Sequence, residues 1–484
     1  MSEPRPVAVI VLAAGEGTRM KSQVPKVLHT LCGRSMLGHA LAAAMELKPS
    51  RLVVVAGHGR EQVTDEARNT SPDVTVVVQE RLGGTGHAVR MVTEALGQLT
   101  GPVLVTYADM PLLRPQTLAD LLRQHETDQE AVTVLTANVS DPHGYGRIVR
   151  DGNGLTGIVE EADATSAQRQ ITEINSGCYA FDGALLTDAI KRIATDNAQG
   201  QEYLTDVVTI LREDGHRVGT LIAENAEEIA GVNDRVQLAR ARRTLNDRLL
   251  DHWMRAGVTI VDPATTWVDV DVQLGQDAQI LPGTYLEGAT TIGKNAQVGP
   301  ECRLTDTTVA EEASVTYTVA RSAEIGPRAT VGPYAYLRPG TRVGEKAHIG
   351  THVELKNATV GTGSKVPHLS YVGDATIGEG ANIGAATVFV NYDGVAKHHT
   401  IIGDHVRIGS DTMLVAPLTV GDGAYTAAGS VISEDVPPGA LGVARGRQHN
   451  SDGWVERKRP GTPAAEAAAR AKAKARAKDK ENGT

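Results

Sequence analysis

The feature that most constrains the fold is a six-residue repeat in the second half of the chain. An aliphatic residue, usually followed by glycine, recurs every six positions. The clearest copies are Ile325, Val331, Leu337, Val343 and Ile349, then Ile402, Ile408, Leu414 and Val420, with earlier ones at Leu274, Leu286, Ile292 and Val298. Coils that repeat in this way stack their aliphatic residues on one another, so the pattern predicts a parallel β-helix over residues 258–446.

Six-residue repeats of this kind resemble those of the left-handed β-helix family, in which three hexapeptides form one triangular coil. The handedness is implied by this resemblance, because crossovers between parallel strands are otherwise right-handed. A stretch from Phe389 to Thr400 interrupts the repeat. An extruded loop in a regular solenoid usually carries function, and the alternative is a drifted surface insertion.

The first half of the chain alternates short β-branched runs with amphipathic stretches. The expected strands are 7–12, 52–56, 74–78, 103–107 and 131–135, and the expected helices between them include 36–47, 87–96 and 117–125. This rhythm predicts an α/β domain over residues 1–232, with a mostly parallel, doubly wound (Rossmann-like) sheet. Ligands of such sheets bind at the carboxyl ends of the strands, so the segments after Leu12 and Tyr107 are the candidate site.

A long helix over residues 234–255 is expected to join the two halves, within a linker at 233–257. Its apolar stripe consists of Leu238, Ala241, Leu245, Leu249 and Trp253, and its arginine-rich opposite face is interpreted as a solvated surface. The last segment, 447–484, becomes rich in alanine, lysine and arginine after Pro460. It offers no apolar face, so a disordered tail is expected.

Bulk properties exclude several classes of protein. The formal net charge of −10 disfavours proteins that coat nucleic acids or membrane surfaces. The first apolar run, at 7–14, is too short to span a membrane and lacks the features of a secretion signal. The three cysteines are far apart and match neither a metal spacing nor a disulfide framework. We therefore expect a cytoplasmic protein that neither inserts into membranes nor binds nucleic acid.

The loop from Leu12 to Lys26 carries the first chemical signal. It follows the first expected strand, and its glycines would let backbone amides approach a triphosphate while Arg19 and Lys26 add positive charge. It is neither a P-loop nor the dinucleotide fingerprint, since no Gly-Lys-Ser/Thr closes it and the third glycine is absent. The whole pattern, L-x-x-G-x-G-T-x-M-x-x-x-x-P-K, resembles the signature of the sugar-nucleotide pyrophosphorylases.

Asp109, at the end of the fourth expected strand, is a candidate ligand for Mg²⁺ beside nucleotide phosphates. Asn233, at the start of the long helix, is a second candidate ligand. Asp109 could instead be an ordinary acidic residue at a strand end, and Asn233 could be a helix N-cap, but the resemblance favours metal ligation for both. Ala108 stands where that family usually has glycine, which puts the space beside the metal in question. The resemblance further implies that Lys26 and Arg19 are catalytic. It implies UTP and UDP-sugar contacts from Leu12, Ala13, Ala14, Gly15, Lys26, Gln79, Gly84, Thr85, Tyr107, Asp109, Gly146, Glu160, Asn175 and Asn233.

His368 carries the second signal, as the candidate general base for acyl transfer to an amine. A single histidine in a solenoid is usually a surface residue. Its surroundings, however, are the motifs Leu337-Arg-Pro-Gly, Val353-Glu-Leu-Lys and Asn391-Tyr-Asp-Gly. With them the chain resembles, from Val7 to Trp454, the bacterial bifunctional N-acetylglucosamine-1-phosphate uridyltransferase/glucosamine-1-phosphate acetyltransferase family.

This resemblance implies a second set of binding residues and a homotrimer with sites between subunits. The acetyl-accepting sugar phosphate would be held by Arg338, Lys356, Lys397, Glu354, Tyr371, Asn382, Asn391 and Tyr392, and acetyl-CoA by Ala385, Ser410, Ala428 and Arg445. Ala386 replaces a residue that is often glycine, which puts the width of the coenzyme channel in question. His398 and His399 are interpreted as solvated loop residues.

The favoured function is acetylation of glucosamine 1-phosphate by acetyl-CoA, followed by transfer of UMP from UTP to the product. UDP-N-acetylglucosamine, a cell-wall precursor, and pyrophosphate would be formed. One alternative is a sugar-nucleotide pyrophosphorylase, such as an adenylyl- or guanylyl-transferring relative, whose β-helix only oligomerises or regulates. Another is a nucleotide-sensing scaffold without catalysis. His368 with its neighbouring motifs argues against the first, and the presence of Lys26 and Asp109 argues against the second.

Overall fold

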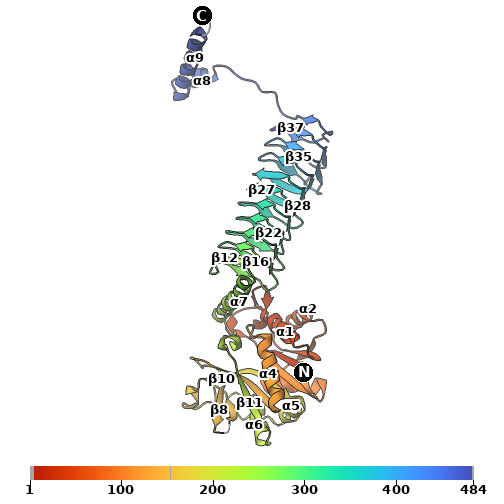
Figure 1. The fold of residues 1–484 in the computed structure, drawn as a ribbon, viewed down its shortest axis with the longest axis vertical. Helices are drawn as coiled ribbons and strands as arrows, with labels where there is room; N and C mark the ends of the chain where they lie inside the picture. Colours follow the sequence, from red (N-terminus) through yellow and green to blue (C-terminus); the bar gives the residue numbers. More distant parts are fainter. Residues whose placement is uncertain (1–4, 153, 482–484) are drawn as a thin grey trace.

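Two differently built halves follow one another along the long axis of the computed structural model, which describes residues 5–152 and 154–481 (Figure 1). The first half is an α/β domain, and the second is a column of stacked coils that continues away from it. Helix α7 (Arg235–Arg255) lies between them. Among the described residues, none of the helices is long and apolar enough to cross a membrane.

The first half is built on one sheet whose main path runs β11-β7-β10-β6-β1-β4-β5. Its strands are β1 (Ala8–Ala13), β4 (Arg51–Ala56), β5 (Thr75–Val78), β6 (Pro102–Tyr107), β7 (Val132–Asn138), β10 (Glu173–Asp182) and β11 (Val218–Ile222), and β8 (Arg147–Asp151) and β9 (Gly154–Val159) form a hairpin at its side. Strands β4, β1 and β6 are parallel, and β10 runs antiparallel to β6 and β7. The predicted strands and the mostly parallel sheet are confirmed.

Helices cover both faces of this sheet. They are α1 (Met36–Glu46), α2 (Arg60–Thr70), α3 (Thr85–Leu96), α4 (Pro115–Asp128), α5 (Gly183–Ala189) and α6 (Asp206–Glu213). Alternate side chains of β1 enter different cores: Val9 and Val11 pack with α1, α2 and α4, whereas Ile10 and Leu12 pack with α3, α5 and α6. Strand β1 lies between β4 and β6: the chain proceeds from β1 through β4 to β5 on one side, then returns to β6 on the other side, so the strand order reverses beside β1. The carboxyl edge beside such a reversal is where doubly wound sheets bind ligands.

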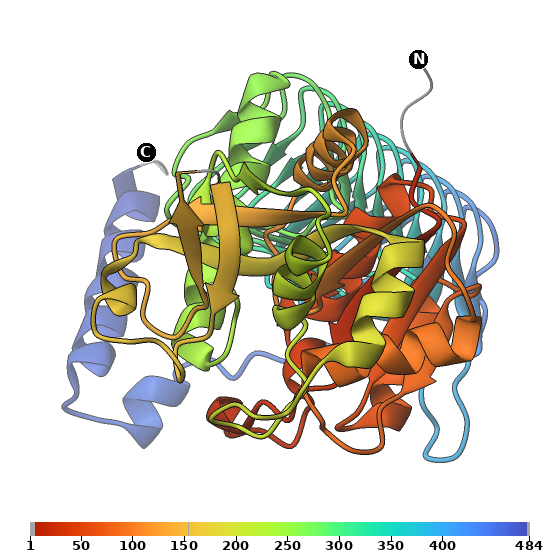
Figure 2. The same ribbon diagram turned by 90° about the horizontal axis from the view of Figure 1, so that it is seen from below.

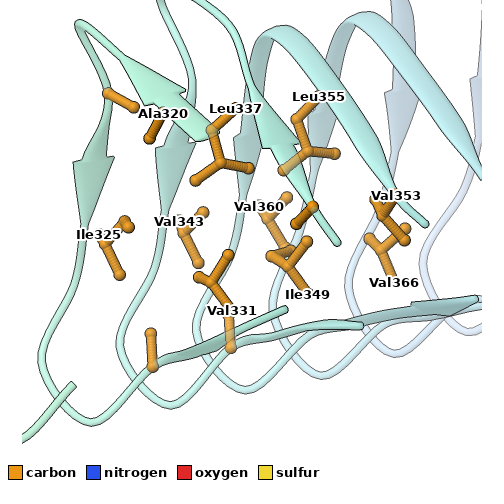
Figure 3. Packing of buried hydrophobic residues seen from close by; sticks show 14 of the residues in the cluster. Ala320, Ile325, Val331, Leu337, Val343, Ile349, Val353, Leu355, Val360 and Val366 are labelled. Carbon is orange, nitrogen blue, oxygen red and sulfur yellow. The ribbon is translucent and has the colours of Figure 1, made fainter. Parts of the chain in front are cut away.

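The second half is a left-handed parallel β-helix, which runs from β12 (Thr259–Ile260) to β39 (Leu441–Gly442). Every aliphatic residue of the clearest repeat is buried; the exposed fraction is 1% for Ile325 and 0% for Ile349, for example. Figure 3 shows these side chains stacked from coil to coil inside the column. Each aliphatic side chain buried in this way contributes about 1.5–3 kcal/mol. The six-residue repeat is therefore the sequence signature of the core.

The predicted interruption is a loop between β32 (Val388–Val390) and β33 (Thr400–Ile402). Both strands pair with β30 (Tyr371–Ile377): Tyr371 faces Val388 and Ala375 faces Thr400. The loop therefore leaves the column at one corner and returns to the same sheet, so the stack of coils continues without a break.

Helix α7 begins at a cap that the sequence did not single out. Asp234, not Asn233, is the N-cap, and its side chain accepts a hydrogen bond from the Gln237 amide at 2.8 Å. The predicted apolar stripe is largely confirmed, but Asn246 is also fully buried. Its side chain donates to the Thr266 carbonyl and accepts from the Val268 amide, which ties the helix to the first coil.

The arginine face of α7 is solvated only in part: Arg240 and Arg255 are exposed, whereas other arginines bind neighbouring segments. Arg242 donates to the Thr30 carbonyl, Arg248 to that of Leu112, and Arg235 to that of Met20. Arg243 stacks on the Trp267 ring at 4.2 Å. Arg243 also donates to the Ala264 carbonyl, so these side chains bind backbone of both halves, because the helix lies in the junction.

The alanine- and lysine-rich end of the chain is helical, contrary to the expected disorder. Helices α8 (Trp454–Lys458) and α9 (Pro463–Glu481) pack on each other, with an ion pair between Lys472 and Glu456. Figure 1 shows this pair apart from the column, at the end of an extended segment. Alanine, lysine and arginine are strong helix formers, so propensity alone supports a helix here without an apolar face.

Candidate active sites

The first candidate site lies at the carboxyl ends of β1 and β6, and Figure 2 views the first half from its far end. The predicted loop folds from β1 through two short 3-10 helices, η1 (Thr18–Met20) and η2 (Lys26–Leu28). Gly17 has a left-handed backbone, and a Cβ there would lie 2.4 Å from the Lys26 Cβ. Glycine is therefore required at residue 17 to bring Lys26 under the loop.

Three predicted residues from distant segments meet at one point. The Lys26 Nζ donates to Asp109 Oδ2 at 2.5 Å and to Asn233 Oδ1 at 3.0 Å. The Lys26 and Asp109 side chains are only 11% and 20% exposed. Asp109 follows β6 and Asn233 precedes α7, so the fold, not the sequence spacing, unites them. Because Asp234 caps the helix, the Asn233 side chain is available for this contact.

The remaining residues predicted for the first site line two adjoining cavities. The first, of about 310 Å³, is lined by Leu12, Ala13, Ala14, Gly15, Lys26, Gln79, Gly84, Thr85, Tyr107 and Asp109. The second, of about 340 Å³, is lined by Arg19, Gly146, Glu160, Asn175 and Asn233 and shares Thr85, Tyr107 and Asp109 with the first. The structure therefore gathers the whole predicted set around one continuous, partly enclosed space.

Gln79 is held in a single orientation. Its Nε2 donates to the Gly84 carbonyl at 3.1 Å and contacts His87 Nδ1 at 2.8 Å. A carbonyl oxygen can only accept, so the atom facing Gly84 must be the amide nitrogen. Within the described residues the Gln79 Oε1 accepts no hydrogen bond. This leaves an oriented acceptor on a residue that lines the first cavity.

The second cavity carries polar groups suited to a sugar. Asn175 is buried, and its Nδ2 donates to the Tyr179 hydroxyl at 2.7 Å. Glu160 accepts from Thr205 at 3.3 Å, and burial raises the pKa of its carboxyl above the ordinary value. Oriented amide and carboxyl groups of this kind can bind sugar hydroxyls.

Sequence reasoning missed the segment before α6. Gln201 lines both cavities, and Tyr203 lines the second. The Glu202 carbonyl accepts from the Gly86 amide, and a Cβ on Gly84 would lie 2.4 Å from that carbonyl. No motif marks this segment, because its place is decided by packing against the Gly84 loop. Ala108 is fully buried in the core beneath, and it is absent from the described linings of both cavities.

The donors at the first site fit Mg²⁺ in part. Asp109 and Asn233 present two oxygens within hydrogen-bonding distance of one atom, and oxygen is the donor that Mg²⁺ prefers. Among the described residues, nowhere do three histidine, cysteine or acidic side chains gather as a metal site. An ion here would therefore complete its coordination with substrate phosphates and water, which is usual for Mg²⁺ in nucleotide enzymes.

The second candidate site lies on the outside of the β-helix. His368 ends β29 (Lys365–His368), its side chain is exposed, and within the described residues its imidazole makes no hydrogen bond. Lys365 pairs with Asn382, Asn382 with Arg407, Arg407 with Tyr425, and Tyr425 with Leu441. Three residues after each of these paired positions, the same register places one residue per coil in a column, with Arg445 next to the last of them. The column consists of His368, Ala385, Ser410, Ala428 and Ala444. The residues predicted for acetyl-CoA thus extend from His368 in a line.

The predicted phosphate-binding cations lie on the neighbouring face. Arg338 pairs with Glu354 at 3.0 Å, and Lys356 pairs with Asp374 at 3.2 Å. Lys397 lies beside Lys356, and the positive charge of Lys356 lowers the pKa of Lys397. Three cations are therefore concentrated beside two carboxylates, a surplus of positive charge suited to a phosphate.

The loop that carries Lys397 is ordered by its own side chains. Asp393 accepts from the Val395 and Ala396 amides and contacts His398 Nε2, each at 2.7 Å. His399 contacts the Thr376 hydroxyl at 2.9 Å. His398 is half-buried and His399 is exposed, so these solvated loop residues also make contacts that order the loop. Tyr392 is 56% exposed and donates to the Gly394 carbonyl.

A single chain does not enclose the second site. His368, Asn382 and the acetyl-CoA column belong to one sheet, whereas Arg338, Lys356, Tyr371 and Asn391 belong to or border the other. The chain turns the corner between these faces at Leu369, which is 62% exposed. Ala386 adopts a left-handed conformation at φ 59°, which glycine adopts more readily, and this explains the expected glycine.

Comparisons with known proteins cover both halves. A family model described as a MobA-like NTP transferase domain matches residues 9–173, and one described as a GMPPB C-terminal domain matches residues 318–421. Relatives named bifunctional protein GlmU match almost the whole chain. The protein of Thermobifida fusca is 64% identical over 473 residues, and that of Streptomyces avermitilis is 63% identical over 471 residues. For each, the match covers 97% of this chain and 98% of the relative. The protein of Nocardia farcinica is 56% identical over 474 residues, which is 96% of both chains.

Proposed function

The chain belongs to the family of bifunctional GlmU proteins, and from this premise we propose that it catalyses two successive steps of UDP-N-acetylglucosamine synthesis. It is an enzyme with two activities, one of them in a nucleotidyltransferase domain. The β-helix acetylates glucosamine 1-phosphate, and the α/β domain then transfers UMP to the product. The observation that carries this proposal is the presence of two separately built sites, one in each half, whose residues match the two chemistries.

In the first reaction His368 acts as the general base. Its imidazole has no competing partner among the described residues, so a ring nitrogen is free to take a proton from the substrate amine. The amine nitrogen attacks the thioester carbonyl of acetyl-CoA, and the thiolate of CoA leaves as the amide forms. The Ala385 backbone amide faces the thioester oxygen, and Arg338, Lys356 and Lys397 hold the sugar phosphate.

In the second reaction a phosphate oxygen of N-acetylglucosamine 1-phosphate attacks the α-phosphorus of UTP. Pyrophosphate leaves in line, so no protein nucleophile is needed. Lys26 and Arg19 offset the negative charge of the phosphates, and Asn175 and Glu160 orient the sugar. Asp109 and Asn233 would hold Mg²⁺, which supplies further charge neutralisation when bound.

The base is read by Gln79. Uracil carries an N–H donor at N3 where cytosine carries an acceptor, and the oriented Gln79 Oε1 is an acceptor. The contacts of Gln79 Nε2 with Gly84 and His87 support this role because they prevent the side-chain amide from turning over.

The acetyl-transfer site is completed by other copies of the chain in a homotrimer. Its residues occupy two faces that meet at an exposed corner, so one chain leaves the substrates open to solvent. Tyr317, Tyr334 and His352 form a row of ring contacts along that corner, in which His352 stacks on Tyr334, and Tyr334 is 57% exposed. Contiguous exposed apolar surface is a mark of protein–protein interaction sites. Sedimentation equilibrium tests the proposal, since a monomer with full acetyl-transfer activity would contradict it.

Two further expectations are part of the proposal. The three cysteines are free and buried, in keeping with a reducing compartment such as the cytoplasm. The partners are small-molecule substrates and not nucleic acids. An enzyme whose β-helix only oligomerises is disfavoured by the column of residues that extends from His368, because a purely structural solenoid has no use for it.

A coupled assay tests the proposed function. Glucosamine 1-phosphate, acetyl-CoA and UTP should together yield UDP-N-acetylglucosamine, pyrophosphate and free CoA. Omitting acetyl-CoA should abolish all products, whereas omitting UTP should still release CoA. If CoA is never released while N-acetylglucosamine 1-phosphate is still uridylylated, the β-helix is not an acetyltransferase.

A further inference from the structure

A ladder of polar side chains stands at the corner where the loop leaves the β-helix. Lys356 pairs with Gly373, so Asn357 and Asp374 form the next rung. Tyr371 pairs with Val388, so Asn391 continues the ladder in the following coil. Asn357 and Asp374 have left-handed backbones, with φ of 45° and 49°. Asparagine and aspartate are the residues that tolerate this conformation best after glycine.

Asp374 is the centre of this ladder. Its Oδ1 accepts from Asn357 Nδ2 at 2.8 Å, and its Oδ2 accepts from Asn391 Nδ2 at 2.5 Å and from Lys356 Nζ at 3.2 Å. The side chain is 13% exposed. Burial by itself would raise the pKa of Asp374, but the hydrogen bonds from Asn357, Lys356 and Asn391 outweigh it and lower the pKa.

These contacts fix two groups that face the proposed substrate. The Asn391 Nδ2 is directed toward Asp374, so the Oδ1 must point away from it and, among the described residues, accepts no hydrogen bond. The Lys356 ammonium is drawn to the carboxylate on one side and lies beside Lys397 on the other. The Asn391 side chain is closely packed, because a Cβ on Gly373 would lie 2.6 Å from Asn391 Nδ2.

We propose that Asp374 is a positioning residue of the acetyl-transfer site, which holds Lys356 and Asn391 in the geometry that binds the sugar phosphate. It does not touch the substrate. Its carboxylate anchors the ammonium that meets the phosphate and turns the Asn391 carbonyl outward as an acceptor for the sugar. The role rests on the proposed function of this site. It explains why a buried carboxylate stands among cations that bind a phosphate.

The test is the substitution Asp374→Asn, which removes the charge but keeps the size and the tolerance of a left-handed backbone. We expect KM for glucosamine 1-phosphate to rise about 10- to 100-fold, since a charge-assisted contact to a buried group is lost. KM for acetyl-CoA should not change, because the coenzyme column lies on the other face. Loss of structure would alter both constants, so this difference separates positioning from folding.

Asp306→Asn is the matched control. Asp306 occupies the same corner several coils earlier, with φ 48°, and its Oδ1 accepts from the Ala289 amide. This variant should keep both constants at wild-type values. If KM for glucosamine 1-phosphate is the same in Asp374→Asn and wild type, the inference is wrong. It is also wrong if Asp306→Asn and Asp374→Asn raise that KM equally.

A double-mutant cycle with Lys356→Met adds a second measurement. Asp374→Asn should cost clearly less when Lys356 is already absent, because the two act through one contact; additive losses would contradict that contact. If Asp374→Asn lowers the unfolding temperature, Asp374→Glu is measured as well. Recovery of KM with the charge supports positioning, and a KM that stays high overturns it.

A failure of the proposed function can be distinguished experimentally from a failure of the role proposed for Asp374. If Arg338→Ala leaves acetylation of glucosamine 1-phosphate intact, the assignment of the whole site is wrong. If Arg338→Ala removes that activity while Asp374→Asn leaves every constant unchanged, the site stands and only the role of Asp374 is wrong. Uridylyl transfer, measured in parallel with N-acetylglucosamine 1-phosphate, should be normal in all of these variants.

Discussion

The two halves of the molecule solve the problem of holding a ligand in opposite ways. The α/β domain forms its candidate site within one chain, with Lys26, Asp109 and Asn233 converging on a single point beside two cavities. The β-helix has no comparable interior, because stacked aliphatic side chains fill it. The site proposed for it therefore lies on the surface, in a column beside His368 and in the loop that interrupts the repeat.

The electrostatics of the two sites differ for the same reason. At Glu160 in the first site, desolvation dominates and raises the pKa of the carboxyl. On the β-helix, hydrogen bonds from neighbouring coils outweigh desolvation and lower the pKa of Asp374. Burial therefore controls the ionisation of Glu160, whereas contacts between successive coils control that of Asp374.

The largest expected effect is that of His368→Ala. Loss of the general base should reduce acetyl transfer by about 10²–10⁴-fold. Uridylyl transfer from N-acetylglucosamine 1-phosphate should be unchanged, because the two sites lie in different halves. Steady-state rates of both reactions on the same preparation measure this. A loss of both activities in a folded variant would show that the two sites are not independent.

Asp109→Ala should have the reciprocal effect. Removing the carboxylate that lies against Lys26 should lower uridylyl transfer by about 10²–10³-fold, as expected when one element of electrostatic stabilisation is lost. Acetyl transfer serves as the internal control. Chelation of divalent cations by EDTA should likewise stop only uridylyl transfer. An EDTA-resistant uridylyl transfer would refute the metal assignment.

The junction between the halves is tested by Asn246→Ala. The substitution leaves the Thr266 carbonyl and the Val268 amide without their buried partner, and should lower the free energy of unfolding by about 1–3 kcal/mol. Arg240→Ala, an exposed position on the same helix, is the control and should have little effect. Urea unfolding followed by both activities also shows whether the halves unfold together. Equal stability of the two variants would mean that Asn246 does not join them.

The smallest effects are opposite dependences on pH. The raised pKa of Glu160 favours its protonated form in the folded state, so its contribution to stability is lost as pH rises through about 4.5 and beyond. Glu160→Gln should therefore gain stability relative to wild type as pH rises above about 4.5. The lowered pKa of Asp374 contributes stability above about pH 4, which is lost at lower pH.

The measurement is the unfolding temperature of each variant relative to wild type as a function of pH. The advantage of wild type over Asp374→Asn should shrink as pH falls below about 4. Slopes of the same sign for the two substitutions would contradict the contrast between burial and hydrogen bonding.

Local sequence patterns predicted the parts of this protein that local physics controls. The six-residue period identified the β-helix core, because each aliphatic residue is buried by its own position in the coil. The run of glycines from Leu12 to Lys26 identified the first loop, because Gly17 must adopt a left-handed backbone against Lys26. The helical tail was missed, since its alanine and lysine content favours helix without the apolar face that was sought.

Only the tertiary structure decided which distant residues meet. Gln201 enters the first site by packing on the Gly84 loop, and Asp374 joins Lys356 to Asn391 through the register of three successive coils. Nothing in the local sequence marks either residue, because register across coils depends on every turn between them. By itself the sequence determined the two folds, the nucleotide loop and the place of His368. The geometry that turns these residues into sites arose only when the segments packed together.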